Sequence, residues 1–244
     1  MTPLWRRVVA EGLGTGLLVT VVVGSGIAAA KLSPDDVGLQ LLENSFATTL
    51  GLAVLILMIG PVSGAHFNPV VSAVDWWLGR GTGSGLSARD LAAYVPVQIS
   101  GAILGAVLAN LMYDEAAVSW STTERAAGHL WLGEVVATAG LIVLIFALAD
   151  SGRAALAPAA VGAYIGAAYW FTSSTSFANP AVTIGRAFSD TFAGIAPASI
   201  PGFVIAQFVG AAVGMGLLAL LYPRAAQAAD AVVIPHEVTT GASK

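Results

Sequence analysis

Two asparagine–proline pairs, Asn68-Pro69 and Asn179-Pro180, are the groups in this chain best suited to act on a small solute. Asparagine caps the first N–H groups of a helix, and proline is tolerated at the first helical position. Each pair therefore predicts the start of a helix. The asparagine amide also brings hydrogen-bond donors to that tip. The chemistry indicated is hydrogen bonding to the oxygen of a passing molecule.

Six apolar segments surround these helix starts, and each approaches the roughly 20 residues that a membrane-spanning helix needs. They cover residues 5–29, 41–59, 91–112, 129–149, 157–171 and 201–222. Two further apolar segments, residues 68–78 and 179–188, begin at the asparagines. At roughly 1.5 Å per residue these can cross only half a bilayer. The sequence predicts an all-α membrane protein with six transmembrane helices and two re-entrant half-helices.

The composition also indicates a lipid environment and excludes several classes of function. The chain has 244 residues, 57% of them hydrophobic and 10% charged, whereas soluble domains carry about 25% charged residues. The absence of cysteine excludes disulfides and thiolate metal sites. The three histidines are far apart, so we expect no metal site and no cofactor. A net charge of −4 offers no basic patch for nucleic acid. The sequence shows no nucleophile–base pair of the kind an enzyme needs, so we expect neither an enzyme nor a catalytic residue.

The two halves of the chain repeat three features in the same order, which indicates a duplication. The matched features are Glu11-x-x-x-Thr15 with Glu134-x-x-x-Thr138, Asn68-Pro69-Val70 with Asn179-Pro180-Ala181, and Gln98-x-x-Gly101-x-x-x-Gly105 with Gln207-x-x-Gly210-x-x-x-Gly214. Each half has three spans, an odd number, so the second copy must enter the membrane inverted. We expect a single domain over residues 1–222, with repeats at about 5–113 and 129–222, and a C-terminal tail over residues 223–244.

The distribution of lysine and arginine predicts the orientation, because cytoplasmic loops carry an excess of these residues. With the N-terminus inside, the cytoplasmic side receives seven basic residues and the other side three. The two sets are Arg6, Arg7, Arg80, Arg89, Arg153, Arg224 and Lys244, against Lys31, Arg125 and Arg186. Both termini are therefore expected in the cytoplasm, and the protein in the cell (inner) membrane.

The residues around both pairs resemble the paired signatures of the aquaporin, or major intrinsic protein, family. They are the runs Ser63-Gly64-Ala65-His66-Phe67-Asn68-Pro69 and Ser176-Phe177-Ala178-Asn179-Pro180-Ala181. The resemblance covers about residues 5–222 and implies a six-helix bundle, usually a homotetramer with one pore per subunit. The two half-helices would meet at the bilayer centre, each placing about half a positive charge there. Such a centre disfavours protons and other cations.

Two carboxylates within spans, Glu11 and Glu134, need a role, because intramembrane charges are costly. They could relay protons, or they could accept hydrogen bonds from the backbone of the re-entrant loops. Their symmetry and the family resemblance favour this bracing role. His66 could equally line the inner mouth of the pore or hold its loop. The repeated glycines are expected to permit close helix approach.

The second motif departs from the usual pattern of the family at the next residue. Typical members continue with an arginine that narrows a cationic selectivity filter, but this chain has Val182. Matched spacing places Thr48 and Ser176 in the filter, together with Tyr169 or, if a loop is shorter, Ala167. This filter resembles that of the bacterial branch linked to arsenic resistance. We expect the pore to be wider and less polar at Val182.

Arg186 lies four residues after Val182, about 6 Å farther along a helix. It could sit at the outer pore mouth and attract polar solutes. The spacing to Asp190 favours the other interpretation, a surface ion pair on one helix face.

These observations predict a passive channel whose partners are the lipid bilayer and small neutral solutes. The expected solutes are glycerol-like polyols and neutral metalloid acids such as arsenous acid, with some water. A water-selective aquaporin is one alternative. An ion-coupled secondary transporter, which can share inverted repeats, is a less favoured one.

Overall fold

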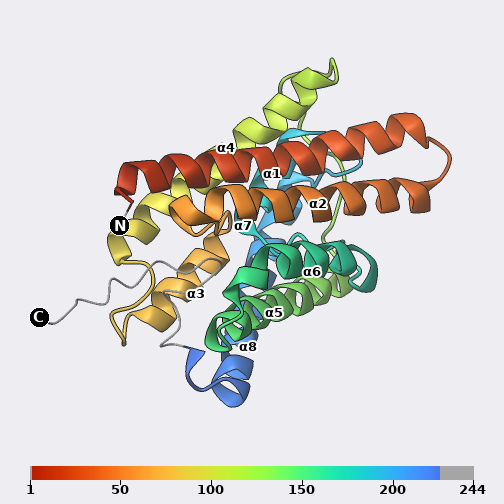
Figure 1. Ribbon diagram of the computed structural model, residues 1–244. Coiled ribbons are helices and arrows are strands. Elements are labelled where there is room, and N and C mark those ends of the chain that lie inside the picture. The colour runs from red at the N-terminus through yellow and green to blue at the C-terminus, as the bar shows by residue number, and fades with distance from the viewer. Residues whose placement is uncertain (1, 226–244) are drawn as a thin grey trace, which may run out of the picture.

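The computed structural model describes residues 2–225, and every regular element in that range is a helix (Figure 1). The long helices are α1 (Leu4–Leu32), α2 (Val37–Ser63), α4 (Ala88–Met112), α5 (Gly128–Asp150), α6 (Ala157–Phe171) and α8 (Ile200–Leu221). The short elements are α3 (Pro69–Gly79), α7 (Pro180–Gly185), η1 (Ala154–Leu156), η2 (Arg186–Phe188) and η3 (Pro197–Ser199). The predicted tail, residues 223–244, lies outside the described residues except for 223–225.

The six long helices, α6 together with the turn η1 that precedes it, are apolar and long enough to cross a membrane, which confirms the predicted all-α fold with six spans. Two of them, α2 and α4, begin earlier than their predicted apolar stretch, because a polar residue caps the first turn. Asp36 accepts a hydrogen bond from the Leu39 N–H at 2.9 Å, so α2 begins at Val37. Ser87 accepts one from the Asp90 N–H at 3.1 Å at the start of α4. Such caps satisfy N–H groups that a helix end otherwise leaves without a partner.

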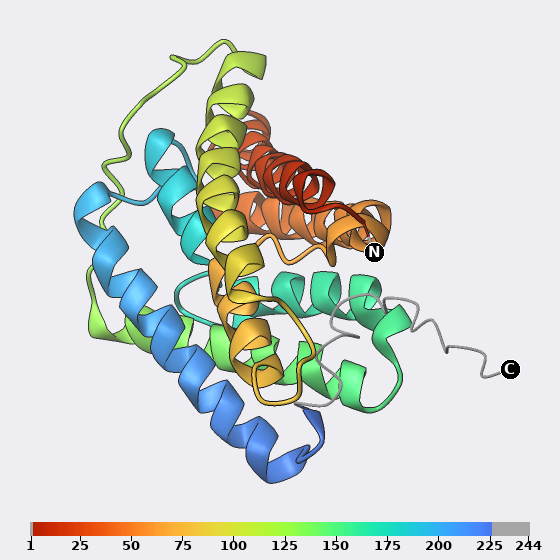
Figure 2. The same ribbon diagram turned by 90° about the vertical axis from the view of Figure 1, so that its left-hand side faces the viewer.

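The helices pack in corresponding pairs in the two halves (Figures 1 and 2). Helix α1 packs on α4, and α5 packs on α8, so the first and third spans of each half are neighbours. Helices α2 and α6, the second spans, pack on each other and join the halves. The half-helices α3 and α7 lie within the bundle and contact each other. Because each half-helix follows the second span of its own half, the two enter from opposite ends.

Glycines set the close approach of α1 and α4. A Cβ atom on Gly101 would lie 2.2 Å from the Gly12 carbonyl oxygen, and one on Gly105 would lie 2.0 Å from that of Gly16. In the second half, a Cβ on Gly214 would lie 2.9 Å from the Ala139 carbonyl oxygen. These helix backbones therefore touch, as helix pairs in membranes often do through small residues.

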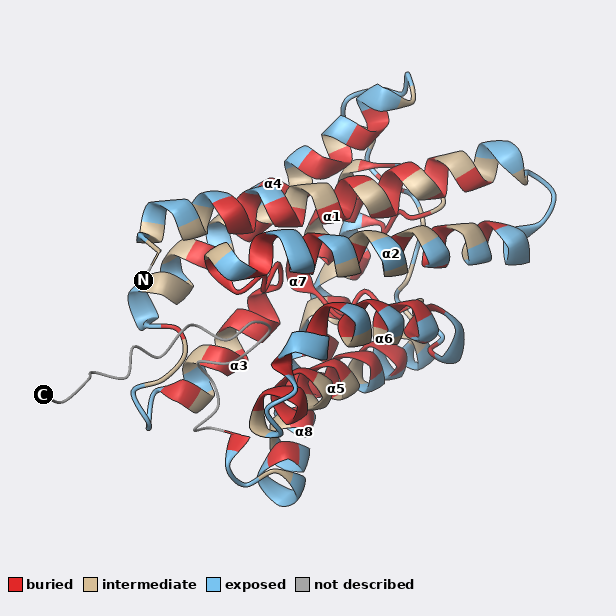
Figure 3. Ribbon diagram, in the orientation of Figure 1, coloured by how far each residue is buried: buried red, intermediate tan, exposed pale blue. Residues whose placement is uncertain are grey.

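Burial follows the helix faces. Buried residues lie on the inward faces of the long helices and along α7, and exposed residues lie outward (Figure 3). The exposed residues include many large apolar side chains, among them Leu50, Leu104, Leu132, Ile205 and Leu220. A soluble monomer rarely exposes so much contiguous apolar surface. The outer surface is therefore suited to lipid, with polar groups kept inside.

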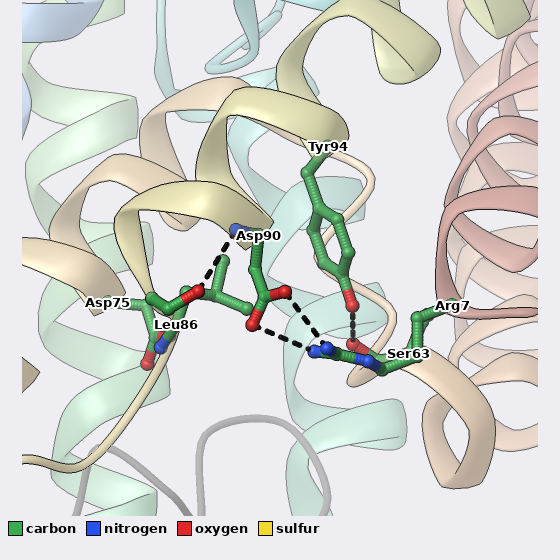
Figure 4. Close-up of polar contacts among 7 residues, drawn as sticks. Arg7, Ser63, Asp75, Leu86, Asp90 and Tyr94 are labelled. Carbon is green, nitrogen blue, oxygen red and sulfur yellow. Dashed lines mark hydrogen bonds and ion pairs between the residues drawn. The ribbon is translucent and has the colours of Figure 1, made fainter. Parts of the chain in front are cut away.

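A polar cluster joins four helices at the end of the bundle where α1 begins, which we call the N-terminal face (Figure 4). The Arg7 guanidinium on α1 donates to both oxygens of Asp90 on α4, at 2.9 and 3.3 Å. The Tyr94 hydroxyl on α4 donates to the Ser63 carbonyl at the end of α2, at 2.8 Å. Asp75 on α3 accepts from the Leu86 N–H at 2.7 Å, which holds the loop before α4. These contacts fix the end of the bundle from which α3 enters.

Candidate pore

The asparagines cap the half-helices as their spacing suggests. The Asn68 side-chain oxygen accepts from the Val70 N–H at 3.0 Å, and that of Asn179 accepts from the Ala181 N–H at 3.0 Å. Pro69 and Pro180 are the first residues of α3 and α7. The two N-termini therefore point toward the middle of the bundle, where α3 and α7 meet.

Each asparagine amide also binds the opposite loop. Asn68 Nδ2 donates to the Ala178 carbonyl at 2.8 Å, and Asn179 Nδ2 donates to the Phe67 carbonyl at 2.8 Å. This pair of reciprocal bonds joins the two halves at the centre. Because an amide nitrogen carries two hydrogens, one donor on each asparagine stays available for a solute.

Both loops before the asparagines have the same unusual backbone. Ala65 and Phe67 have φ values of 51° and 50°, and Ser176 and Ala178, at the matching positions, have 49° and 48°. Non-glycine residues in this left-handed region cost of order 1 kcal/mol and need support from their surroundings. This conformation forms the sharp turns that bring each asparagine to the tip of its half-helix.

Two fully buried carboxylates hold those turns. Glu11 accepts from the backbone N–H groups of His66 and Phe67, at 3.0 and 2.7 Å. Glu134 accepts from those of Phe177 and Ala178, at 2.9 and 2.8 Å. These are hydrogen bonds of the kind a brace requires, because the loop N–H groups have no water to bind in a membrane.

Two glutamines complete the braces, a role for which their repetition in the sequence was the only signal. Gln98 Nε2 donates to Glu11 at 2.8 Å, and Gln207 Nε2 donates to Glu134 at 2.6 Å. Gln98 and Gln207 also donate to hydroxyls on the half-helices, Ser72 and Thr183 respectively. The third span of each half thus fixes both the carboxylate and the half-helix.

A cavity of about 60 Å³ passes the tips of both half-helices. It is lined by residues 65–68 and 176–179 of the two loops, and by apolar side chains of the long helices. The apolar side chains include Leu18, Leu52, Ile56, Leu141, Ile145 and Ile165. The volume suffices for a few water-sized molecules. One flank therefore offers polar loop groups and asparagine amides, and the other is aliphatic.

The four predicted filter residues, Thr48, Tyr169, Ser176 and Val182, all line this cavity. The Thr48 and Tyr169 hydroxyls lie 3.2 Å apart, so α2 and α6 meet here. Ala167, the alternative to Tyr169, is exposed on the outer surface of α6. The structure therefore places Tyr169 at this level of the cavity.

The predicted surface pair between Arg186 and Asp190 is wrong. Arg186 is buried, with 2% of its surface exposed, and it lines the cavity beside Val182. Its Nε donates to the Ala193 carbonyl, and its guanidinium carbon lies 3.5 Å from the centre of the Phe177 ring. Asp190 instead accepts from the Thr122 N–H at 2.8 Å. The i, i+4 argument failed because α7 ends at Gly185 and the chain then leaves the α-helical path.

This position changes the expectation of a less polar constriction. The residue after the second motif is the aliphatic Val182, yet Arg186 brings a guanidinium to the same cavity from the next turn. A guanidinium group stays protonated in proteins. The side chain therefore stays charged at neutral pH and, like the half-helix N-termini, opposes the entry of cations.

A second arginine, Arg125, was not predicted as a site residue, because nothing in its sequence context distinguishes it from an ordinary loop cation. Its Nε donates to the Gly194 carbonyl at 2.9 Å, and its guanidinium carbon lies 5.1 Å from the Phe177 ring centre. Burial lowers its pKa. Arg125 and Arg186 both line a further cavity of about 180 Å³, which we call the vestibule, at the face opposite the N-terminal face.

His66, for which the sequence left two roles open, lines the cavity and contacts side chains of α3 and α4. Its Nδ1 lies 3.1 Å from the Ser72 hydroxyl, and its ring packs edge-on against Tyr94 at 5.8 Å. It therefore lies in the cavity wall and is held by α3 and α4.

Known proteins share this sequence over most of its length. The aquaglyceroporin AqpS of Rhizobium meliloti (strain 1021) is 52% identical over 215 residues, which cover 88% of this chain and 89% of that protein. The glycerol uptake facilitator protein of Pseudomonas aeruginosa is 31% identical over 272 aligned residues, covering 93% of this chain and 94% of that protein. Both alignments include nearly all of both proteins.

The fold has a solved counterpart. The X-ray structure of the aquaglyceroporin from Plasmodium falciparum superposes with a TM-score of 0.65 over 93% of this chain and all of that chain. At 18% identity this likeness shows the fold alone. A sequence model of the family described as major intrinsic protein matches residues 1–176. With its six spans, paired half-helices and capping asparagines, this chain belongs to the major intrinsic protein family, whose members are multi-pass membrane channels for small solutes.

Proposed function

We propose that this protein is a passive channel for small uncharged solutes, namely glycerol-like polyols and neutral metalloid acids such as arsenous acid, with some water. The observation that carries the proposal is the make-up of the filter. Thr48 stands where water-selective members of the family usually have a bulky aromatic residue, and Val182 stands where they have an arginine. Small side chains at both positions favour a passage that admits a carbon chain.

The cavity wall supports the same solute class. Its aliphatic flank can contact the carbon atoms of a polyol, while Asn68 and Asn179 each keep an amide hydrogen for a hydroxyl oxygen. Arsenous acid is a compact neutral triol, so it meets the same groups. A neutral solute loses far less hydration energy on entering such a passage than an ion does. The positive charge of Arg186 adds a barrier to cations.

The proposal is tested with purified protein in liposomes. Stopped-flow swelling in an inward glycerol gradient is compared with swelling of empty liposomes, and shrinkage in a sucrose gradient measures water. Uptake of arsenous acid is measured as arsenic retained after gel filtration. We expect rapid, non-saturating glycerol and arsenous acid flux that needs no ion gradient. Water flux with polyols excluded would favour the water-selective alternative, and saturable uptake driven by an ion gradient would favour a transporter.

The assembly and placement follow from the same reasoning. We propose a homotetramer, with one pore per subunit, in the cell (inner) membrane and with the N-terminal face in the cytoplasm. Membership of the family supports the homotetramer, whereas the excess of arginine at that face and the exposed apolar faces of the long helices support the placement in the membrane. Native mass spectrometry in mild detergent measures the copy number. Protease access to a C-terminal epitope, in intact and in opened cells, measures the orientation.

A further inference from the structure

The vestibule at the face opposite the N-terminal face contains two arginines, the buried Arg186 and the partly buried Arg125, and neither forms an ion pair with a carboxylate within residues 2–225. Among the described residues, Arg7 forms an ion pair with Asp90, and Lys31 forms one with Glu115. Neither involves Arg125 or Arg186. Glu134 is the carboxylate whose charge acts on both, but its oxygens already accept from two loop N–H groups and Gln207. The vestibule therefore holds two positive charges with no dedicated counter-ion.

Both guanidiniums are fixed in place rather than free to extend into water. The Nε atoms of Arg125 and Arg186 donate to the carbonyls of two consecutive residues, Gly194 and Ala193. Both groups also contact one ring, Phe177. These contacts use one donor of each side chain. The terminal nitrogens, with four further N–H donors on each guanidinium, make no hydrogen bond to residues 2–225.

Holding two like charges together in a partly buried site is unfavourable unless a negative charge joins them. Planar guanidiniums bind oxyanions through pairs of parallel N–H···O bonds, which makes arginine the usual residue for carboxylate and phosphate-type ligands. The vestibule has about 180 Å³, enough for a small ion of this kind. Its other lining residues include the polar Asn44 and Thr175, and no acidic residue that would repel an anion.

We propose that Arg125 and Arg186 form an oxyanion-binding site at the entrance of the pore, for small anions of the sulfate, phosphate or carboxylate type. Arg186 and Tyr169 line both the vestibule and the filter cavity, so an ion bound here stands directly in front of the filter. Its occupancy therefore slows the entry of neutral solutes. The proposal goes beyond the conduction proposed above, and it holds whichever neutral solute passes.

Binding is tested first, in detergent, with sulfate as the probe because it is charged at every pH the protein tolerates. Equilibrium dialysis against radiolabelled sulfate, at ionic strength held constant with chloride, gives the dissociation constant. Arg125→Gln and Arg186→Gln are each expected to weaken binding on the order of tenfold or more, since a charged hydrogen bond contributes about 1.5–3 kcal/mol. Arg125→Lys keeps the charge without the paired donors and should fall between.

The matched control is Arg153→Gln, which removes the same charge from an exposed residue at the N-terminal face, beyond α5. It should bind sulfate as the unmodified protein does. Only variants that elute as the native species in gel filtration are compared. No saturable sulfate binding by the unmodified protein, or equal binding by the Arg125→Gln and Arg153→Gln variants, would overturn the site.

Flux is tested second, as the ratio of glycerol permeability with and without sulfate in proteoliposomes. Sulfate should lower this ratio saturably for the unmodified protein and for Arg153→Gln, but not for Arg125→Gln. Sulfate that binds without changing the ratio would overturn the placement at the entrance. A protein that passes no glycerol even without sulfate would contradict the proposed function, while the dialysis result would still decide the site.

Discussion

The hydroxyl groups of Thr48 and Tyr169 lie 3.2 Å apart across the junction of α2 and α6. This contact joins the second spans of the two halves at the level of Val182 and Arg186, all of which line one cavity. Tyr169 is held by this contact, and Thr48 has a small side chain. The width of the cavity at this level therefore depends on the size of the residue at position 48.

Replacing Thr48 by phenylalanine should convert the channel toward water selectivity. The larger side chain fills space beside Tyr169 and removes the hydroxyl that bonds it. We expect glycerol permeability to fall about tenfold or more while water permeability changes much less, because size at a constriction discriminates strongly. The control is Leu50→Phe, on the exposed face of the same helix. Stopped-flow light scattering of proteoliposomes measures both, and equal losses for the two variants would contradict the filter assignment.

Replacing Val182 by arginine should reduce polyol passage and spare water. The new guanidinium would share the cavity with Arg186, one turn away, so the constriction would become narrower and more positive. We expect glycerol flux to fall by about tenfold, the ratio that a misfit of one or two methylene groups produces. Val182→Ile, which adds one methylene group without charge, is the control. Unchanged glycerol swelling in Val182→Arg would show that Val182 does not border the passage.

The missing cysteine provides a direct map of the cavity wall. Mercurials should leave solute flux unchanged in the native chain, since it has no thiol. Val182→Cys should become sensitive, with recovery on adding excess dithiothreitol. Leu50→Cys, whose side chain faces outward, should react without loss of flux. Mercurial inhibition of the native chain that dithiothreitol reverses would contradict the prediction that mercurials block only by binding a thiol in the cavity.

Replacing Glu11 by glutamine should destabilise the first re-entrant loop. The carboxylate accepts from Ser63, His66, Phe67 and Gln98, and an amide nitrogen in place of one oxygen would face donors that it cannot accept from. Leaving a buried donor unsatisfied costs about 1–3 kcal/mol. We expect a lower thermal midpoint in detergent, followed by intrinsic tryptophan fluorescence.

The same variant separates the brace from a proton relay. Proteoliposomes loaded with a pH-sensitive dye should show proton leakage equal to that of the native protein under a pH gradient. A native protein that conducts protons, with conduction lost in Glu11→Gln, would favour the relay.

Replacing Gly105 by alanine should weaken the contact between α1 and α4. The added methyl group would meet the Gly16 carbonyl oxygen at 2.0 Å, so the helix backbones would have to separate. Overpacking of this kind costs about 1–3 kcal/mol. The control is Gly216→Ala on α8, where a Cβ meets nothing within 4 Å. We expect the control to be neutral or slightly stabilising, and equal thermal midpoints for the two variants would contradict the packing argument.

The six spans, the half-helices and their starts were predictable from the sequence, because a bilayer imposes constraints that are local in the chain. A span needs roughly 20 apolar residues whose backbone bonds are internal. An asparagine–proline pair marks a helix start through groups within three residues of each other. Glu11 and Gln98 recur as Glu134 and Gln207 in the second half of the sequence. In the structure each glutamine donates a hydrogen bond to the glutamate of its own half.

The partners of the arginines, by contrast, were decided only by the tertiary structure. Helical spacing paired Arg186 with Asp190, but the turn after Gly185 carries Arg186 into the cavity and onto Phe177, while Asp190 binds Thr122. Arg125 reaches the same ring from a loop far away in the sequence. Spacing alone also did not decide whether Tyr169 or Ala167 lies in the filter. The rotation of α6 places Tyr169 in the cavity wall and Ala167 on the outer surface. Side-chain contacts between distant segments depend on loop paths and helix rotation, which periodicity within one segment does not encode.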